Sequence, residues 1–323
     1  MNFEAEIEEL EGQLVELKEL SERTQLDLTD EIATLTGRLE QAIAATYADL
    51  TPWDRVKVSR HPDRPVLTTY VDGILDEFVE LHGDKAFGED LAMMTGLARI
   101  EDTRFLLIGH RKGTTTKERI ACNFGSAHPE GYRKALKKMR LAEKLKLPIV
   151  TMINTPGAYP GIGAEERGQA EAIARNILEM FNVRVPILVI IIGEGGSGGA
   201  LGIGIGDRVL MMEYAYYSVI SPEGCAAILW KDGSRTPDAA EALKLGASDL
   251  MKLNLIDGVI KEPVGGAHRD KEATAEEVKR TILDTLAELS KIPMDELLAQ
   301  RLKKFRYAGK IEGRFPSVEG VPS

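Results

Sequence analysis

The chain has 323 residues, 43% of them hydrophobic, and its formal net charge is −10. This length and apolar fraction allow a sizeable core, whereas the negative charge argues against non-specific nucleic-acid binding, which needs a positive field. The two cysteines, Cys122 and Cys225, lie far apart, which argues against a cysteine-built zinc site and against a disulfide framework.

The N-terminal segment is acidic, unlike a signal or transit peptide, and no apolar run is long enough to cross a membrane. We therefore expect a cytoplasmic protein. Apolar residues recur at helical spacing in two stripes, separated by a polar stretch: Ile7, Leu10, Leu14 and Leu17, then Ile32, Leu35, Leu39 and Ile43. This pattern predicts a helical hairpin, an arm over residues 1–52. It leaves open whether the arm packs on its own domain or on a partner chain.

Beyond a turn-rich connector at residues 61–65, apolar strands and amphipathic helices alternate. Strands are expected at 105–109, 148–154, 186–192, 208–212 and 217–220, and helices at 129–147, 164–181, 222–230, 237–245, 274–289 and 294–307. This alternation predicts an α/β fold with a largely parallel sheet. We expect one domain over residues 53–308 and a flexible tail over 309–323.

A dense glycine cluster follows the buried strand at 186–192, from Gly193 to Gly206. Glycine lets a ligand approach the backbone closely, although it lowers helix stability by roughly 0.5–1 kcal/mol relative to alanine. Exposed N–H groups at the start of a helix stabilise negative charge. The cluster therefore indicates an anion or oxyanion site made by the main chain.

Two other patterns fit the same cluster. Gly193 to Gly198 matches GxGxxG, but the acidic residue expected about 20 positions later in a dinucleotide-binding unit has no clear candidate, since Glu213 comes early. The sequence around Ser197 matches GxSxG, and Asp249 or Asp257 with His268 would complete a serine-hydrolase triad in the required order. No P-loop motif is present.

Three further segments allow both a structural and a functional interpretation. Residues 155–163 form a glycine- and proline-rich turn, which is either a strand-to-helix connection or a loop that lines a substrate. Residues 221–225 are typical of a capped helix start. The helix expected at 129–147 is basic, with seven lysine and arginine residues, and presents either a solvated face or a landing surface for an anion.

Several long motifs, in order, resemble the carboxyltransferase alpha subunits of multi-subunit acetyl-CoA carboxylase. They lie at residues 129–135, 155–161, 163–169, 193–200, 218–225 and 265–269, and the helical arm adds to the likeness. The resemblance covers nearly the whole chain and implies a crotonase-like (ClpP/crotonase) fold, a spiral of ββα units. The sequence departs from the family pattern at Asn154, where aspartate is common, and slightly at Thr114–Thr116.

The resemblance also implies the function. The family transfers the carboxyl group from carboxybiotin, carried on the biotin carboxyl carrier protein, to acetyl-CoA, and the malonyl-CoA formed feeds fatty-acid synthesis. It implies an α2β2 assembly with a beta subunit that carries a zinc ribbon, and a larger complex that includes biotin carboxylase. Biotin would not be attached to this chain, and no metal is expected in it.

By motif match, the backbone amides of Gly198 and Gly199 would form the hole for the biotin oxyanion. Gly157 and Ala158 would line the neighbouring pocket, and Gly195 and Gly196 would contribute to substrate binding. No side-chain base is required by this chemistry, because preorganised main-chain donors stabilise the charge that develops.

Overall fold

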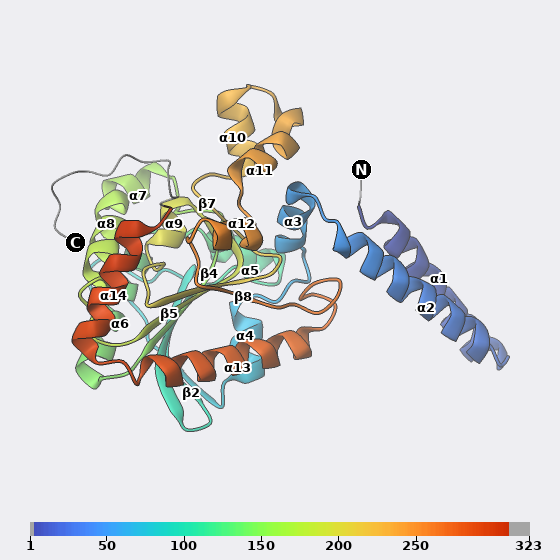
Figure 1. Cartoon of the computed structure of the whole chain (residues 1–323), viewed down its shortest axis with the longest axis horizontal. Helices are drawn as coiled ribbons and strands as arrows, with labels where there is room; N and C mark the ends of the chain where they lie inside the picture. The colour runs from blue at the N-terminus through green and yellow to red at the C-terminus, as the bar shows by residue number, and fades with distance from the viewer. Residues whose placement is uncertain (1–2, 310–323) are drawn as a thin grey trace.

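The computed structural model describes residues 3–309, in which eight strands form a single sheet surrounded by helices (Figure 1). The strands are β1 (Glu77–Glu80), β2 (Met93–Ile100), β3 (Thr103–His110), β4 (Ile149–Thr155), β5 (Ile187–Gly196), β6 (Arg208–Met212), β7 (Tyr216–Ser218) and β8 (Gly258–Ile260). The helices of the first half are α1 (Ala5–Thr24), α2 (Thr29–Ala48), α3 (Pro52–Ser59), α4 (Leu67–Ile74), α5 (Thr116–Ala121), the 3₁₀ turn η1 (Asn123–Gly125), α6 (Pro129–Leu145), α7 (Ile162–Glu166) and α8 (Gln169–Met180).

The helices of the second half are α9 (Ser197–Leu201), α10 (Pro222–Leu229), the 3₁₀ turn η2 (Gly233–Arg235), α11 (Thr236–Leu243), α12 (Ala247–Lys252), α13 (Lys271–Leu289) and α14 (Met294–Tyr307). This α/β architecture agrees with the fold class expected from the sequence.

The sheet has the strand order β1-β2-β3-β4-β5-β6-β8, and β7 pairs with the far end of β5. Strands β3 to β6 and β8 run parallel, whereas β1 and β2 form an antiparallel edge. Every residue of β4 and β5 is buried, as their continuous apolar sequences require of strands covered on both faces. Parallel pairing brings the carboxyl ends of β3, β4 and β5 to one edge.

Two predicted elements differ from the structure. The single helix expected over 164–181 is divided into α7 and α8, because Gly168 takes a left-handed conformation with φ of 81°. The strand expected to stop at residue 192 continues through the glycines to Gly196. Its extension pairs with Thr155 of β4 on one side and with β7 on the other. Neighbouring strands thus override the weak strand preference of glycine.

Two parts project from the body in Figure 1. The first is a hairpin formed by α1 and α2, the two helices that the apolar stripes predicted. The second is formed by α10, η2 and α11. The division of the chain at residues 52 and 308 stays a prediction, and the predicted flexible tail falls, apart from Gly309, outside the described residues.

Candidate functional site

The loops that follow β4 and β5 pack main chain against main chain. A Cβ atom added at Gly196 would lie 2.1 Å from the carbonyl oxygen of Pro156, and one at Gly199 would lie 2.4 Å from the nitrogen of Ala158. Real Cβ atoms do not approach so closely, and therefore both positions require glycine. The structure thus brings both predicted glycine segments together at the carboxyl edge of the sheet, where parallel sheets bind ligands.

The turn from β5 into α9 has an unusual backbone. Ser197 is exposed and has φ of 54°, a left-handed conformation that is uncommon outside glycine. Its neighbour Gly198 is partly exposed and has room for a Cβ atom, which would meet Ile173 at the ordinary contact distance of 3.9 Å. The N–H groups of Gly198 and Gly199 belong to the first turn of α9 and have no acceptor within that helix. The turn therefore offers main-chain donors beside a partly exposed glycine.

The loop after β4 is fixed by its own side chain. The Thr155 hydroxyl accepts from the Gly157 N–H at 3.1 Å and donates to the Gly157 carbonyl at 2.8 Å. Gly157 has φ of 152°, which favours glycine. Ala158 follows directly and faces Gly199 across the contact described above. Gly157 and Ala158 therefore lie in a rigid loop against the second glycine segment.

A buried charged cluster lies beneath these loops. The Glu194 carboxylate accepts from Arg60 Nε at 2.7 Å and from Tyr216 Oη at 2.9 Å, and it also pairs with Lys112. Burial raises the pKa of Glu194, but Lys112 and Arg60 oppose burial and leave the pKa below its ordinary value. The carboxylate is therefore ionised, and the cluster ties α3, the end of β3 and β7 to the start of the glycine run.

This cluster was not predicted from the sequence, although a signal was present. Glu194 follows seven apolar or glycine residues in a strand that is buried throughout. A buried acid requires a cationic partner, and the nearby basic loop supplied one in Lys112. The cluster borders a pocket of about 270 Å³ lined by Arg60, Lys112, Arg119, Asn154 and Pro156 among others.

Asn154, which departs from the family pattern, has a structural role. Its Oδ1 accepts from the Glu194 N–H at 3.1 Å, and a Cβ at Gly193 would lie 2.8 Å from the same oxygen. Aspartate could accept the same hydrogen bond. The substitution therefore removes a charge but keeps the contact that connects β4 to β5.

His110 lies at the end of β3 and is fully buried. Among residues 3–309, neither of its ring nitrogens has a hydrogen-bond partner. Burial, with Lys112 nearby, lowers the pKa of His110 to about 3, while the backbone of Gly199 acts in the opposite direction. The imidazole is thus neutral and close to the second glycine segment.

The serine-hydrolase triad is not assembled. Ser197 lies at the turn into α9, whereas the His268 ring stacks on His61 with centroids 3.9 Å apart, and among residues 3–309 its nitrogens have no hydrogen-bond partner. Asp257 accepts from the Val209 N–H and from Lys304. The hydrolase hypothesis therefore gains no support. The glycine run is also mostly strand, followed by a helix of five residues, unlike the long helix of a dinucleotide-binding unit.

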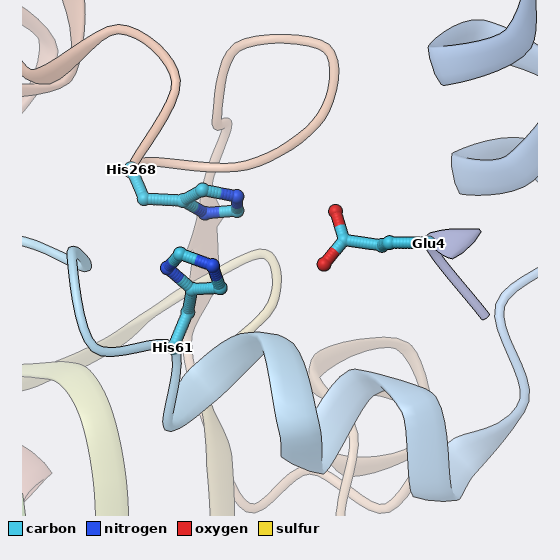
Figure 2. Close-up of side chains that lie close together, drawn as sticks. All are labelled: Glu4, His61 and His268. Atoms are coloured by element: carbon cyan, nitrogen blue, oxygen red, sulfur yellow. The ribbon is translucent and has the colours of Figure 1, made fainter. Parts of the chain in front are cut away.

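Figure 2 shows His61 and His268 with the Glu4 carboxylate facing their ring edges. One possible ligand atom from each lies within 4.8 Å of the other two. However, Glu4 Oε1 accepts from Tyr47 Oη at 2.7 Å and from Arg269 at 3.0 Å. The cationic Arg269 opposes the binding of a second cation there. We therefore assign this cluster to attachment of the arm.

Several basic residues of α6 pair with acidic residues of the chain. Arg133 donates to Asp84 at 2.9 Å, Lys134 pairs with Glu89, and Arg140 donates to Glu179 at 2.8 Å. Lys134 is 1% exposed, so its charge is buried in this contact. The expectation of a solvated face is thus met at Arg140, which is exposed although it is paired, and not at the buried Lys134. The landing surface for an anion stays a prediction. A nearby acidic loop at residues 84–90 neutralises much of the helix.

Among residues 3–309, no helix is both long and apolar enough to cross a membrane.

The family described as "Acetyl co-enzyme A carboxylase carboxyltransferase-like" matches residues 1–309. A protein of Fusobacterium nucleatum called acetyl-coenzyme A carboxylase carboxyl transferase subunit alpha is 53% identical over 309 residues, which cover 96% of this chain and 99% of the relative. A protein of the same name from Rhodopirellula baltica is 50% identical, covering 96% of this chain and 97% of the relative.

Solved structures share the fold at low sequence identity. Transcarboxylase 12S has a TM-score of 0.57 and 16% identity, and the match covers 70% of this chain and 41% of that one. The beta subunit of geranyl-CoA carboxylase from P. aeruginosa has a TM-score of 0.55 and 20% identity, with 76% and 46% covered. The fold is therefore crotonase-like, and this chain spans less than half of either structure.

Proposed function

Because the chain belongs to the family of acetyl-CoA carboxylase carboxyltransferase alpha subunits, we propose that it transfers the carboxyl group of carboxybiotin to acetyl-CoA together with a beta subunit. The product is malonyl-CoA, and the reaction is the first step of fatty-acid synthesis. The chain is a carboxyltransferase component of a biotin-dependent enzyme. The observation that carries the detailed proposal is the main-chain packing of the two glycine loops, which leaves Gly198 uncrowded.

Carboxybiotin supplies the carboxyl group, and negative charge develops on its ureido oxygen as that group leaves. In this proposal the N–H groups of Gly198 and Gly199 donate to that oxygen. Rigid donors act well because they need no reorganisation during the reaction, and losing one such donor typically slows catalysis about 10²- to 10³-fold. We expect the ureido ring beside Gly198, where an added Cβ would meet Ile173 only at an ordinary contact distance.

The other loop residues support these donors. Gly157 and Ala158 hold the wall opposite Gly199 and are proposed to line the biotin pocket. Gly195 and Gly196 are buried in β5 between β4 and β7. We propose that they contribute to substrate binding by fixing the position of the loop that follows them. The pocket lined by Arg60, Lys112 and Arg119 lies beside the loops, and its positive charge suits an anionic substrate.

An alpha subunit implies a beta subunit, and we propose an α2β2 assembly with zinc held by the beta subunit's ribbon. The biotin carboxyl carrier protein and biotin carboxylase would complete the enzyme in the cytoplasm. The projection formed by α10, η2 and α11 is a suitable docking surface (Figure 1), because Ile228 and Leu229 of α10 are 69% and 65% exposed, and Val219, which precedes the helix, is 76% exposed. Large exposed apolar side chains gathered on one projection mark interaction sites.

The test is reconstitution. The purified chain should show negligible malonyl-CoA decarboxylation with free biotin as acceptor, and the activity should appear when the beta subunit is added. Replacing Leu229 with aspartate should weaken co-purification of the two subunits, because a charge would be buried at the interface. Full activity of the isolated chain would contradict the proposal, as would an inactive but fully assembled complex.

A further inference from the structure

The helix that carries the proposed donors cannot hold its shape by itself. α9 has five residues, and two of its first three are glycine. Isolated helices shorter than about 12–15 residues are marginal in water, and each glycine lowers helix stability further. Since Gly198 is partly exposed, contacts from neighbouring helices must fix the peptide planes of this turn.

Those contacts come from two buried side chains on neighbouring helices. Tyr132 of α6 donates its hydroxyl to the Gly199 carbonyl at 3.2 Å. Asn176 of α8 donates its amide to the Gly202 carbonyl at 2.9 Å and to the Tyr132 carbonyl at 3.0 Å. Tyr132 and Asn176 are 0% and 1% exposed. A single network thus joins α6 and α8 to the beginning and the end of α9.

The packing of Tyr132 matches this arrangement. A Cβ atom at Gly202 would lie 2.6 Å from Cε1 of the Tyr132 ring, so the ring packs directly against the main chain of Gly202. The Gly202 N–H in turn donates to the Gly198 carbonyl at 2.9 Å. The carbonyls of Gly198, Gly199 and Gly202 are therefore each held by a defined donor. The Gly198 carbonyl shares its peptide plane with the Gly199 N–H, so this network fixes the direction of the Gly199 amide and holds the rest of the turn in place.

We propose that Tyr132 and Asn176 are positioning residues for carboxyl transfer, which hold in place the turn that presents the Gly198 and Gly199 amides to the ureido oxygen. The inference rests on the proposed function of those two amides. Neither side chain reaches the substrate. Their hydrogen bonds replace the local stability that a glycine-rich turn lacks, and a small displacement of a catalytic group is sufficient to slow a reaction strongly.

The decisive variant is Tyr132→Phe, which keeps the ring on Gly202 and removes only the hydroxyl. In the reconstituted complex, we expect kcat for malonyl-CoA decarboxylation with free biotin to fall about 10-fold. The KM for malonyl-CoA should change less than about two-fold, because the hydrogen bond orients a donor that acts in the transition state. The rate is normalised to assembled complex, so a loss of folded protein does not count.

The matched control is Tyr70→Phe. Tyr70 is 1% exposed, and its hydroxyl contacts the sulfur of Met212 at 3.3 Å on another side of the core. Its removal should lower the melting temperature by a similar amount and leave kcat unchanged. Asn176→Ala should lower kcat as well, and the double variant Tyr132→Phe/Asn176→Ala should lose less than the product of the two single effects, since both residues act in one network.

A kcat for Tyr132→Phe equal to that of Tyr70→Phe would overturn the inference. If the wild-type complex turns over and the kcat of Tyr132→Phe is unchanged, this inference fails while the proposed function stands. A wild-type complex without turnover would remove the proposed function, and the role of Tyr132 with it.

Discussion

The glycine loops and the attachment of the arm both join distant parts of the chain, but by different means. At the loops, the main chain of residues 156–158 contacts the main chain of 196–199 directly. At the arm, side chains make the contacts: Tyr47 packs on Tyr214 with ring centroids 5.5 Å apart, and Arg269 pairs with Glu4. Side chains can adjust, whereas packed backbones cannot. We therefore expect abrupt effects of substitution at the loops and graded effects at the arm.

The largest expected effect is that of Gly199→Ala. Its Cβ would lie 2.4 Å from the Ala158 nitrogen, so one of the two loops must move and the proposed donors with it. We expect the transfer rate of the reconstituted complex to fall at least about 10²-fold. The rate is measured with malonyl-CoA and free biotin, at equal concentrations of assembled complex.

Two other glycines sharpen this prediction. The Cβ added in Gly198→Ala would meet only Ile173, at 3.9 Å, so the loop should stay in place. The activity lost in this variant should appear as a higher KM for biotin. Gly37→Ala, in the arm, has no atom within 4 Å of the added Cβ and should leave the rate unchanged. If Gly199→Ala behaved like Gly37→Ala, the rigid-backbone account of the site would be wrong.

An intermediate effect is expected on the pH dependence of stability. The pKa of His110 is about 3 in the folded chain and is ordinarily 6.5. Between these values the unfolded chain binds the additional proton, so the free energy of unfolding should fall as the pH is lowered from about 6.5 towards 3. This fully buried group alone should account for a loss of about 2 kcal/mol between pH 7 and pH 5.

Urea unfolding at the two pH values measures the loss, and His110→Gln should reduce it. The pKa of His268 at the arm is also lowered to about 3, by burial, by His61 and by Arg269. Because this side chain is only partly buried, His268→Gln should change the pH dependence less than His110→Gln does. A larger effect of His268→Gln than of His110→Gln on the pH dependence of stability would contradict the contrast between a rigid site and an adaptable arm.

The smallest effect is expected for Arg269→Met, which removes the ion pairs with Glu4 and Glu11. Partly exposed pairs contribute about 1 kcal/mol or less, so amide exchange in α1 should become faster while the melting temperature changes little. Arg280→Met removes a surface pair with Glu277 on α13 and should leave exchange in α1 unchanged. Global unfolding of the Arg269→Met variant would show that the arm is part of the core.

Much of the fold could be predicted from the sequence, because periodicity identifies elements that bury one face. The two apolar stripes predicted α1 and α2, and the β-branched run predicted β5. The same reasoning failed at Gly168 and Gly196, where a glycine's conformation depends on its neighbours: a left-handed turn in one case and strand pairing in the other. Local preference is weak wherever glycine is dense.

The packing of the two glycine segments could be anticipated from the sequence, whereas the side chains that support them could not. The glycine cluster after a buried strand predicted main-chain donors, and in the structure this segment packs against the loop after β4. The cationic partners of Glu194 and the contact between Tyr132 and Gly199 join residues far apart in the chain. Such pairs depend on tertiary packing, and a single sequence carries only the signal that a buried polar group needs a partner.

The most direct test of the main-chain site is a structure of the assembled alpha and beta subunits with biotin bound. The account predicts the ureido oxygen at about 3 Å from the nitrogens of Gly198 and Gly199, within hydrogen-bond distance. A well-ordered biotin whose ureido oxygen is bound elsewhere, with both amides left facing solvent, would contradict it.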